Sequence, residues 1–142
     1  MNSGTGVSFI APMTAMAALI FSVLFWLLLT RIFYIREGKV RLSYFRVYPA
    51  TEPVAPLMAQ AARSLTNLFE MPVLFFVACL TFMVANRGSA DDLNLAWGYV
   101  ALRMVHTLIH LSYNNVKHRL FVYTLSSVAL GVFWLRLACG HG

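Results

Sequence analysis

The chain has 142 residues, of which 60% are hydrophobic and only 11% are charged. Its mean hydropathy of +0.71 excludes an ordinary soluble domain and indicates an integral membrane protein. The net charge is +6, but no basic run lies on a soluble module, so we expect no nucleic-acid partner. Loop cations that orient the chain and attract lipid head groups or an anionic ligand explain this charge better.

Four apolar stretches predict an all-α, integral membrane four-helix bundle that forms one domain over residues 1–142. The first stretch lacks the basic residues of a signal peptide and is too long for one, so we expect it to be retained as a span. The two cysteines, Cys79 and Cys139, provide neither a disulfide framework nor metal-ligand spacing. The predicted spans cover about residues 9–33, 57–85, 93–113 and 119–138.

Lysine and arginine are distributed unevenly between the connections, which predicts the orientation of the chain. The second connection carries only Arg87, whose charge Asp91 and Asp92 offset, and either aspartate can cap the third helix. Near the end of the fourth span, Arg136 can extend its charge to the interface. We expect the first and third connections to face the cytoplasm and both termini to lie on the opposite side. The basic residues in and beside those two connections are Arg31, Arg36, Lys39, Arg41, Arg46, Lys117 and Arg119.

The second predicted span begins with a polar stretch, residues 60–72. Within it Arg63, Asn67 and Glu70 are spaced i, i+4 and i+7, which places their side chains on one helical face. Each charge in the middle of a bilayer costs about 2.5–3.5 kcal/mol. These side chains therefore need polar partners, which either a ligand or a purely interhelical network can supply.

Two more polar faces lie at the same depth under the predicted orientation. Their members are Arg103, His106, His110 and Tyr113 on the third span and Arg119 and Tyr123 on the fourth. Arginines outnumber the one carboxylate at this depth, Glu70, so the charge count predicts an anionic guest. Glu70 can then receive an ammonium group from the guest, although an ion pair with Arg103 is an alternative. Since no cysteine or acidic residue shares the face of His106 and His110, we expect no metal site.

The spacing of these residues forms a pattern along the second, third and fourth spans. The second span carries R-x-x-x-N-x-x-E followed by a proline, and the third carries R-x-x-H-T. The residues concerned are Arg63, Asn67, Glu70, Pro72, Arg103, His106, Thr107, Arg119 and Tyr123, with Val40-Arg41-Leu42 after the first span. This pattern resembles the MAPEG superfamily, the membrane-associated proteins in eicosanoid and glutathione metabolism, in a bacterial-type member.

The resemblance implies a homotrimer in the bacterial inner membrane that binds glutathione between adjacent subunits, near the cytoplasmic face. The implied substrate-binding residues are Arg41, Arg63, Asn67, Glu70, Arg103, His106 and His110. Arg119 and Tyr123 would be catalytic, because a cation such as Arg119 near the sulfur lowers the pKa of the thiol and favours the thiolate. The expected activity is that of a glutathione transferase or peroxidase acting on a hydrophobic small-molecule electrophile.

Three positions depart from the family pattern. They are Thr66, where a basic residue is common, His110, where a tyrosine is common, and Leu120, where a hydroxyl residue is common. Thr66 and Leu120 favour a second hypothesis, a non-catalytic lipid-binding or scaffolding membrane protein of the same fold. Arg119 and Tyr123 favour the enzyme.

Overall fold

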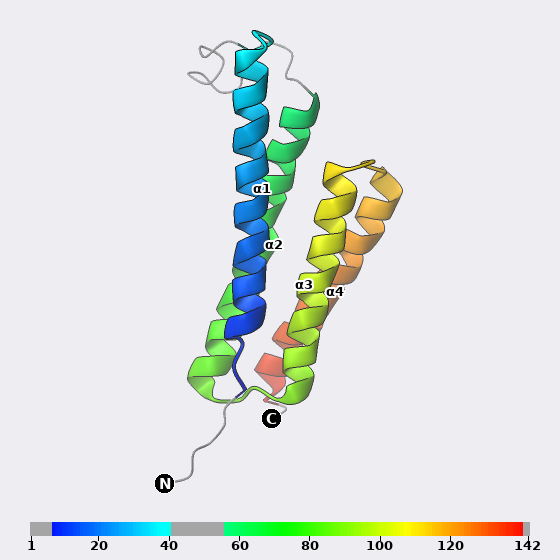
Figure 1. The fold of residues 1–142 in the computed structure, drawn as a ribbon. Coiled ribbons are helices and arrows are strands. Elements are labelled where there is room, and N and C mark those ends of the chain that lie inside the picture. Colours follow the sequence, from blue (N-terminus) through cyan, green and yellow to red (C-terminus); the bar gives the residue numbers. More distant parts are fainter. Residues whose placement is uncertain (1–6, 41–55, 141–142) are drawn as a thin grey trace.

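A computed structural model of the chain describes residues 7–40 and 56–140. The described part contains four helices that run alternately up and down (Figure 1). This confirms the predicted all-α four-helix architecture. The helices are α1 (Ile10–Arg36), α2 (Pro56–Ala85), α3 (Ala90–Leu111) and α4 (Val116–Cys139).

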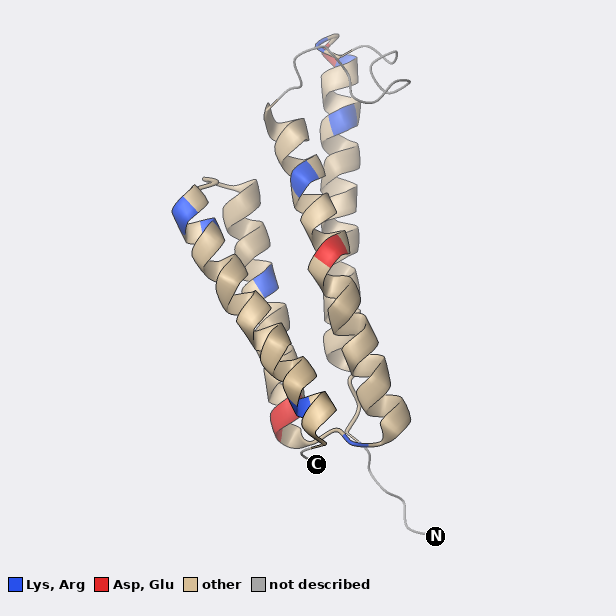
Figure 2. Cartoon of the chain, turned by 180° about the vertical axis from the view of Figure 1, so that it is seen from behind, with Lys and Arg blue, Asp and Glu red and all other residues tan. Residues whose placement is uncertain are grey.

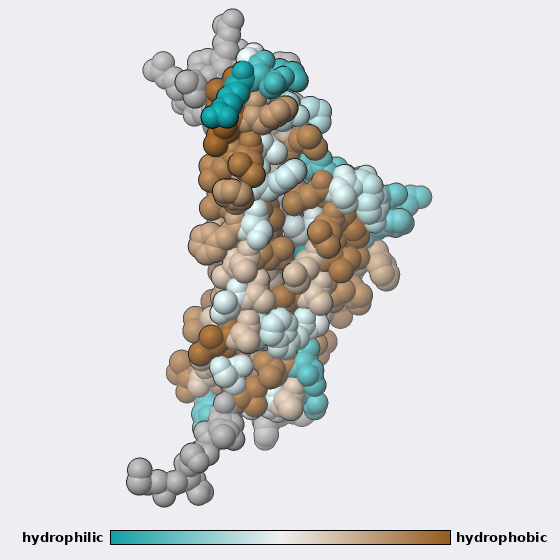
Figure 3. Space-filling view, in the orientation of Figure 1, coloured by the Kyte–Doolittle hydropathy of each residue, from teal (hydrophilic) through white to brown (hydrophobic). Residues whose placement is uncertain are grey.

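Three of the four helices, α1, α2 and α4, are long and apolar enough to cross a membrane. The polar residues of α3 keep it outside this group, although its 22 residues extend for about 33 Å, slightly more than a bilayer core. Large apolar side chains cover the outside of the bundle; for example, Phe21 is 68% exposed and Phe121 is 69% exposed. Figure 3 shows this apolar surface along α1, with hydrophilic residues at its upper end. The protein is therefore an integral membrane protein whose outer face contacts lipid.

The helices form two pairs, in which α1 packs mainly against α2 and α3 packs mainly against α4. Figure 1 shows that the pairs are closest at the end that holds both termini and diverge toward the other end. There α1 and α2 extend beyond the connector between α3 and α4. Figure 2 shows the same divergence from behind, with most lysine and arginine residues in the half away from the termini.

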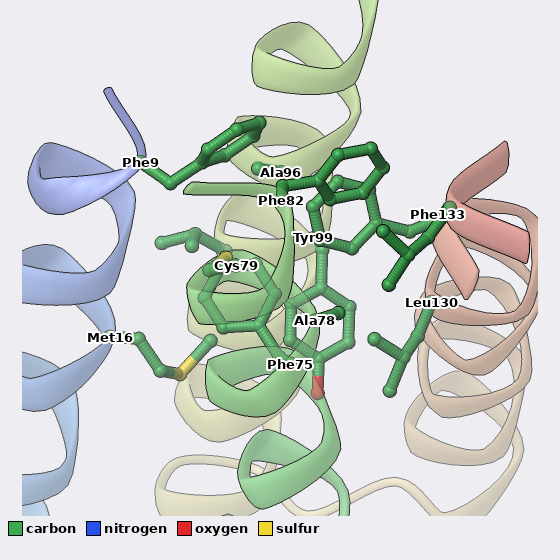
Figure 4. Close-up of a cluster of buried hydrophobic side chains, with 12 residues drawn as sticks. Phe9, Met16, Phe75, Ala78, Cys79, Phe82, Ala96, Tyr99, Leu130 and Phe133 are labelled. Carbon is green, nitrogen blue, oxygen red and sulfur yellow. The ribbon is translucent and has the colours of Figure 1, made fainter. Parts of the chain in front are cut away.

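Buried aromatic side chains hold the two pairs together near the termini (Figure 4). The ring of Phe75 on α2 stacks on Tyr99 of α3 at a centroid distance of 4.8 Å, and the rings of Phe82 and Phe133 lie equally close. Phe9, just before α1, stacks on Phe82 at 5.4 Å. Its ring leaves no room for a side chain at Gly88, where a Cβ atom would lie 2.6 Å from it.

An ion pair between a buried carboxylate and a partly exposed arginine closes the same end of the bundle. Ser89 is the N-cap of α3, and its hydroxyl and the Asp92 carboxylate form a capping box. Of the two predicted aspartates, Asp92 therefore takes part in capping this helix, but from the third helical position, and the N-cap itself is Ser89. The fully buried Asp92 also accepts a hydrogen bond from Arg136 Nε. Arg136 thus binds a partner on α3 rather than extending to the interface, and it ties the end of α4 to the start of α3.

We expect Asp92→Asn to lower the free energy of unfolding by about 2–3 kcal/mol, because it leaves Arg136 without its buried counter-charge. Thermal unfolding of the purified protein in detergent measures this loss as a lower Tm. Asp91→Asn is the matched control, since Asp91 is the exposed neighbour on the same helical turn. Equal Tm values for the two variants would contradict the role assigned to the ion pair.

Candidate functional site

A cavity of about 560 Å³ lies between α2 and the connector that joins α3 to α4. This volume is within the usual range of small-molecule sites. The lining residues belong to the end of the bundle where the helix pairs diverge in Figure 1, and none of them belongs to the aromatic core. The lining residues are Gln60, Arg63, Thr66 and Asn67 of α2, His110 of α3, Asn114 of the connector, and Val116 and Arg119 of α4. Four of the residues predicted from the sequence, on three different helices, therefore meet at one cavity.

The α2 wall of the cavity is a polar stripe. Gln60, Arg63 and Asn67 follow one another at three- and four-residue intervals, so they share a helical face. Arg63 Nε donates to the Ala59 carbonyl at 3.4 Å, within its own helix. Among the described residues Arg63 forms no ion pair. Its charge is therefore available to an anion in the cavity.

Gln60 is a site residue that sequence reasoning missed. Its side-chain amide donates a hydrogen bond to the backbone carbonyl of His110. That carbonyl lies in the last turn of α3, where helical carbonyls lack an N–H partner of their own helix. Gln60 thus joins the two diverging helix pairs across the cavity. Its position three residues before Arg63 on the same face was the signal that could have revealed it.

Arg119 is held in the cavity by two contacts with α3 and the connector. Its Nη1 atom donates to the Asn114 side-chain oxygen at 2.8 Å. Its backbone carbonyl lies 3.2 Å from Nδ1 of His106, and because a carbonyl can only accept, the imidazole carries a proton on Nδ1. His106 therefore orients the start of α4 from behind the cavity and is not one of its lining residues.

The cavity is electropositive, since Arg63 and Arg119 line it and no carboxylate does. Glu70 continues the stripe of Arg63 and Asn67 along α2, but it is exposed on the outside of this subunit. The sequence correctly places Glu70 on the same side of the helix in register. Glu70 nevertheless lies outside the cavity of its own chain, because it is seven residues, or about 10 Å along the helix axis, beyond Arg63.

Arg103 lies in the interior rather than in the cavity wall, and it is completely buried. Its Nε atom donates to the hydroxyl of Tyr99 at 3.1 Å. Its guanidinium carbon lies 5.2 Å from the ring centre of Tyr123 and 5.6 Å from that of Tyr99. No ion pair with Glu70 is present in the described chain, and the Arg103 Nη atoms have no hydrogen-bond partner there. Two aromatic faces provide the main compensation for this charge, each worth up to about 2 kcal/mol when desolvated.

The other predicted site residues surround this buried arginine or lie apart from it. The Tyr123 ring, 5.6 Å from that of His106, lies behind the cavity rather than in its wall. Tyr113 follows the end of α3 and is exposed, so it does not continue the polar face of that helix. Arg41 lies outside the described residues. No group of three or more histidine, cysteine, aspartate or glutamate side chains that could hold a metal occurs in the part of the chain that the structure describes.

The arrangement is a polar, cationic cavity at one end of an apolar four-helix bundle. The model of the MAPEG family matches residues 9–139, nearly the whole chain. The chain belongs to the MAPEG family. This confirms the resemblance on which the sequence analysis relied and makes the chain a membrane protein of a family associated with eicosanoid and glutathione metabolism. Neither the curated proteins nor the solved structures contain a match.

We expect Gln60→Ala to lower the free energy of unfolding by about 1 kcal/mol, because the His110 carbonyl loses its partner. Thermal unfolding in detergent measures the change. Thr66→Ala is the control: Thr66 lines the same cavity, but its hydroxyl bonds only within α2, to the Ala62 carbonyl at 3.1 Å. If the two variants unfold at the same temperature, Gln60 does not join the helix pairs.

Proposed function

We propose that this MAPEG protein is a membrane-bound, glutathione-dependent transferase or peroxidase that acts on hydrophobic electrophiles. The observation that carries the proposal is the cavity with two arginines and no carboxylate, at one end of a MAPEG bundle. Glutathione has two carboxylates, and arginine binds carboxylates in a bidentate manner. A cavity of this charge suits such a ligand better than a neutral or cationic one.

In this proposal Arg63, Asn67 and His110 hold the carboxylates and amides of glutathione, and Arg119 lies next to its sulfur. A nearby cation stabilises the thiolate, so the thiol proton leaves to solvent and the sulfur becomes a nucleophile. In the transferase reaction the thiolate bonds to an electrophilic carbon and displaces its leaving group. In the peroxidase reaction the thiolate attacks the terminal oxygen of a hydroperoxide, the O–O bond breaks and the alcohol leaves, and a second glutathione then reacts with the oxidised sulfur to give the disulfide and water. Tyr123 is one turn after Arg119 on α4 and half-buried behind the cavity of the single subunit, and the proposal assigns its hydroxyl the second catalytic role.

We further propose that the protein is a homotrimer and that glutathione binds at the boundary between two subunits. One observation supports this. Glu70 is exposed on an outer surface that otherwise faces lipid, where an unpaired charge is costly. A neighbouring subunit would cover it, so that Glu70 receives the ammonium group of a ligand bound beside it. Arg41 in the first connection completes the proposed binding set, and Arg103 and His106 support it from the interior behind the cavity.

The proposed location is the bacterial inner membrane, with the cavity toward the cytoplasm. The basic residues that gather in the half away from the termini support this orientation (Figure 2). Glutathione would then reach the cavity from the cytoplasm, and the hydrophobic substrate would reach it from the bilayer.

A non-catalytic lipid-binding or scaffolding role is the second candidate. One observation favours it: no carboxylate lines the cavity of the single subunit, so nothing there binds an ammonium group. An anionic lipid head group without an amine suits that lining. The two candidates differ in whether glutathione binds and forms a thiolate.

We expect the purified protein to bind millimolar glutathione and Glu70→Ala to bind it at least tenfold more weakly, because the ligand ammonium group loses its ion pair. Isothermal titration calorimetry measures both affinities. Arg36→Ala, which removes an exposed cation at the end of α1 away from the cavity, is the control and should bind normally. A native protein with no measurable affinity for glutathione would eliminate the enzyme and leave the lipid-binding role.

Arg119→Ala should weaken glutathione binding at least tenfold and show at least a tenfold smaller thiolate fraction, because the cation that contacts the ligand and stabilises its thiolate is gone. The ultraviolet absorbance of the thiolate in the bound complex, together with turnover of a model electrophile, measures this. Turnover that survives the substitution would move the thiolate role to another residue, with Tyr123 the first to test.

A further inference from the structure

Asn114, in the connector between α3 and α4, has a left-handed backbone with φ of +47°. Side-chain-bearing residues seldom adopt this conformation, and asparagine is among those that tolerate it best. This conformation lets the Asn114 N–H donate to the Ile109 carbonyl at 2.9 Å, which satisfies one of the last carbonyls of α3. The turn therefore restricts the choice of residue before any ligand is considered.

The side chain of Asn114 has a different partner, the guanidinium of Arg119. Its oxygen accepts from Nη1 at 2.8 Å, and both residues line the cavity. It does not cap the following helix, because the Asn115 side chain does so by accepting from the backbone N–H groups of Lys117 and His118. The helix cap and the contact with Arg119 thus belong to two adjacent asparagines with separate tasks.

We propose that Asn114 is a positioning residue that holds the Arg119 guanidinium in the cavity, ready for an anionic group. An unrestrained arginine loses side-chain entropy when it binds a ligand, and a side chain that is already ordered loses less. The hydrogen bond occupies one of the five guanidinium N–H groups and leaves the others for the ligand. This proposal depends on the proposed function for the identity of the ligand, glutathione, but not for the contact itself.

Three requirements meet at this position: tolerance of a positive φ, a hydrogen-bond acceptor, and the absence of charge. Glycine tolerates the backbone conformation but has no acceptor. Aspartate has the acceptor in the same place, but its charge would neutralise Arg119 and repel the anion. Asparagine satisfies all three requirements, which explains its presence at a cavity that has no carboxylate.

The decisive comparison is between Asn114→Gly and Asn86→Gly. Asn86 is in the connector between α2 and α3, at the opposite end of the bundle, and its φ of +52° is also left-handed. Both substitutions keep the turn conformation accessible and change the flexibility of the unfolded chain in the same way. Only Asn114→Gly removes an acceptor from Arg119, so any difference between the two variants reports on that contact.

We expect Asn114→Gly to weaken glutathione binding about tenfold and to reduce the thiolate absorbance of the complex, as the loss of a hydrogen bond to a charged group predicts. Asn86→Gly should bind like the native protein. Asn114→Asp should bind glutathione more weakly than Asn114→Gly, because the negative charge of the aspartate repels the anionic ligand. Equal affinities of the two glycine variants would overturn the proposal.

A measurement without glutathione separates this proposal from the proposed function. In protein labelled with ¹⁵N-arginine, NMR in detergent micelles reports how freely each guanidinium rotates, and Arg119→Lys identifies the signal of Arg119. We expect restricted rotation in the native protein and in Asn86→Gly, and free rotation in Asn114→Gly. Free rotation in the native protein would overturn the positioning role. A native protein that shows restricted rotation but binds no glutathione would instead overturn only the proposed enzyme.

Discussion

The structure depends on the high cost of leaving a polar group unpartnered in a bilayer, and its two ends meet this cost differently. At the end with the termini, Asp92, Arg136 and Ser89 bond to one another. That end is closed, and its polar groups contribute to stability. At the other end the helix pairs diverge, and Arg63 and Arg119 face a cavity without any carboxylate. The end where these two arginines lack a carboxylate partner within the described chain is therefore the end that can bind an anionic ligand.

The aromatic core connects these two ends. Phe75 stacks on Tyr99, whose hydroxyl accepts from Arg103. The guanidinium of Arg103 in turn lies against the ring of Tyr123, one turn from Arg119 on α4. A continuous series of contacts therefore runs from the rigid half of the bundle to the rear of the cavity. Because Arg103 has no acidic neighbour in the described chain, its place depends on these rings rather than on a salt bridge.

Much of the fold could be predicted from the sequence, because apolar stretches of membrane length leave few alternatives to helices. The predicted orientation of the spans likewise places Arg63, Asn67, His110 and Arg119 at one depth, and the structure has all four in the lining of one cavity. The prediction that the third span extends to Tyr113 was wrong at its end. The turn at Asn114 ends α3 at Leu111, so Tyr113 lies beyond the helix. The face shared with Arg63 could indicate that Gln60 belongs to the site, but its partner, the backbone carbonyl of His110, depends on how the helices pack and has no local signal.

The unequal lengths of the helices have a consequence for access to the cavity. With 27 and 30 residues, α1 and α2 extend for about 40 and 45 Å, against about 33 Å for α3. A hydrocarbon layer of about 30 Å covers the shorter helix almost completely and leaves part of the longer pair among the head groups. The α3–α4 pair thus ends below the end of the α1–α2 pair, and the cavity lies at this difference in height, between α2 and the α3–α4 connector. A water-soluble molecule and an oily one can approach it from two sides of the same boundary.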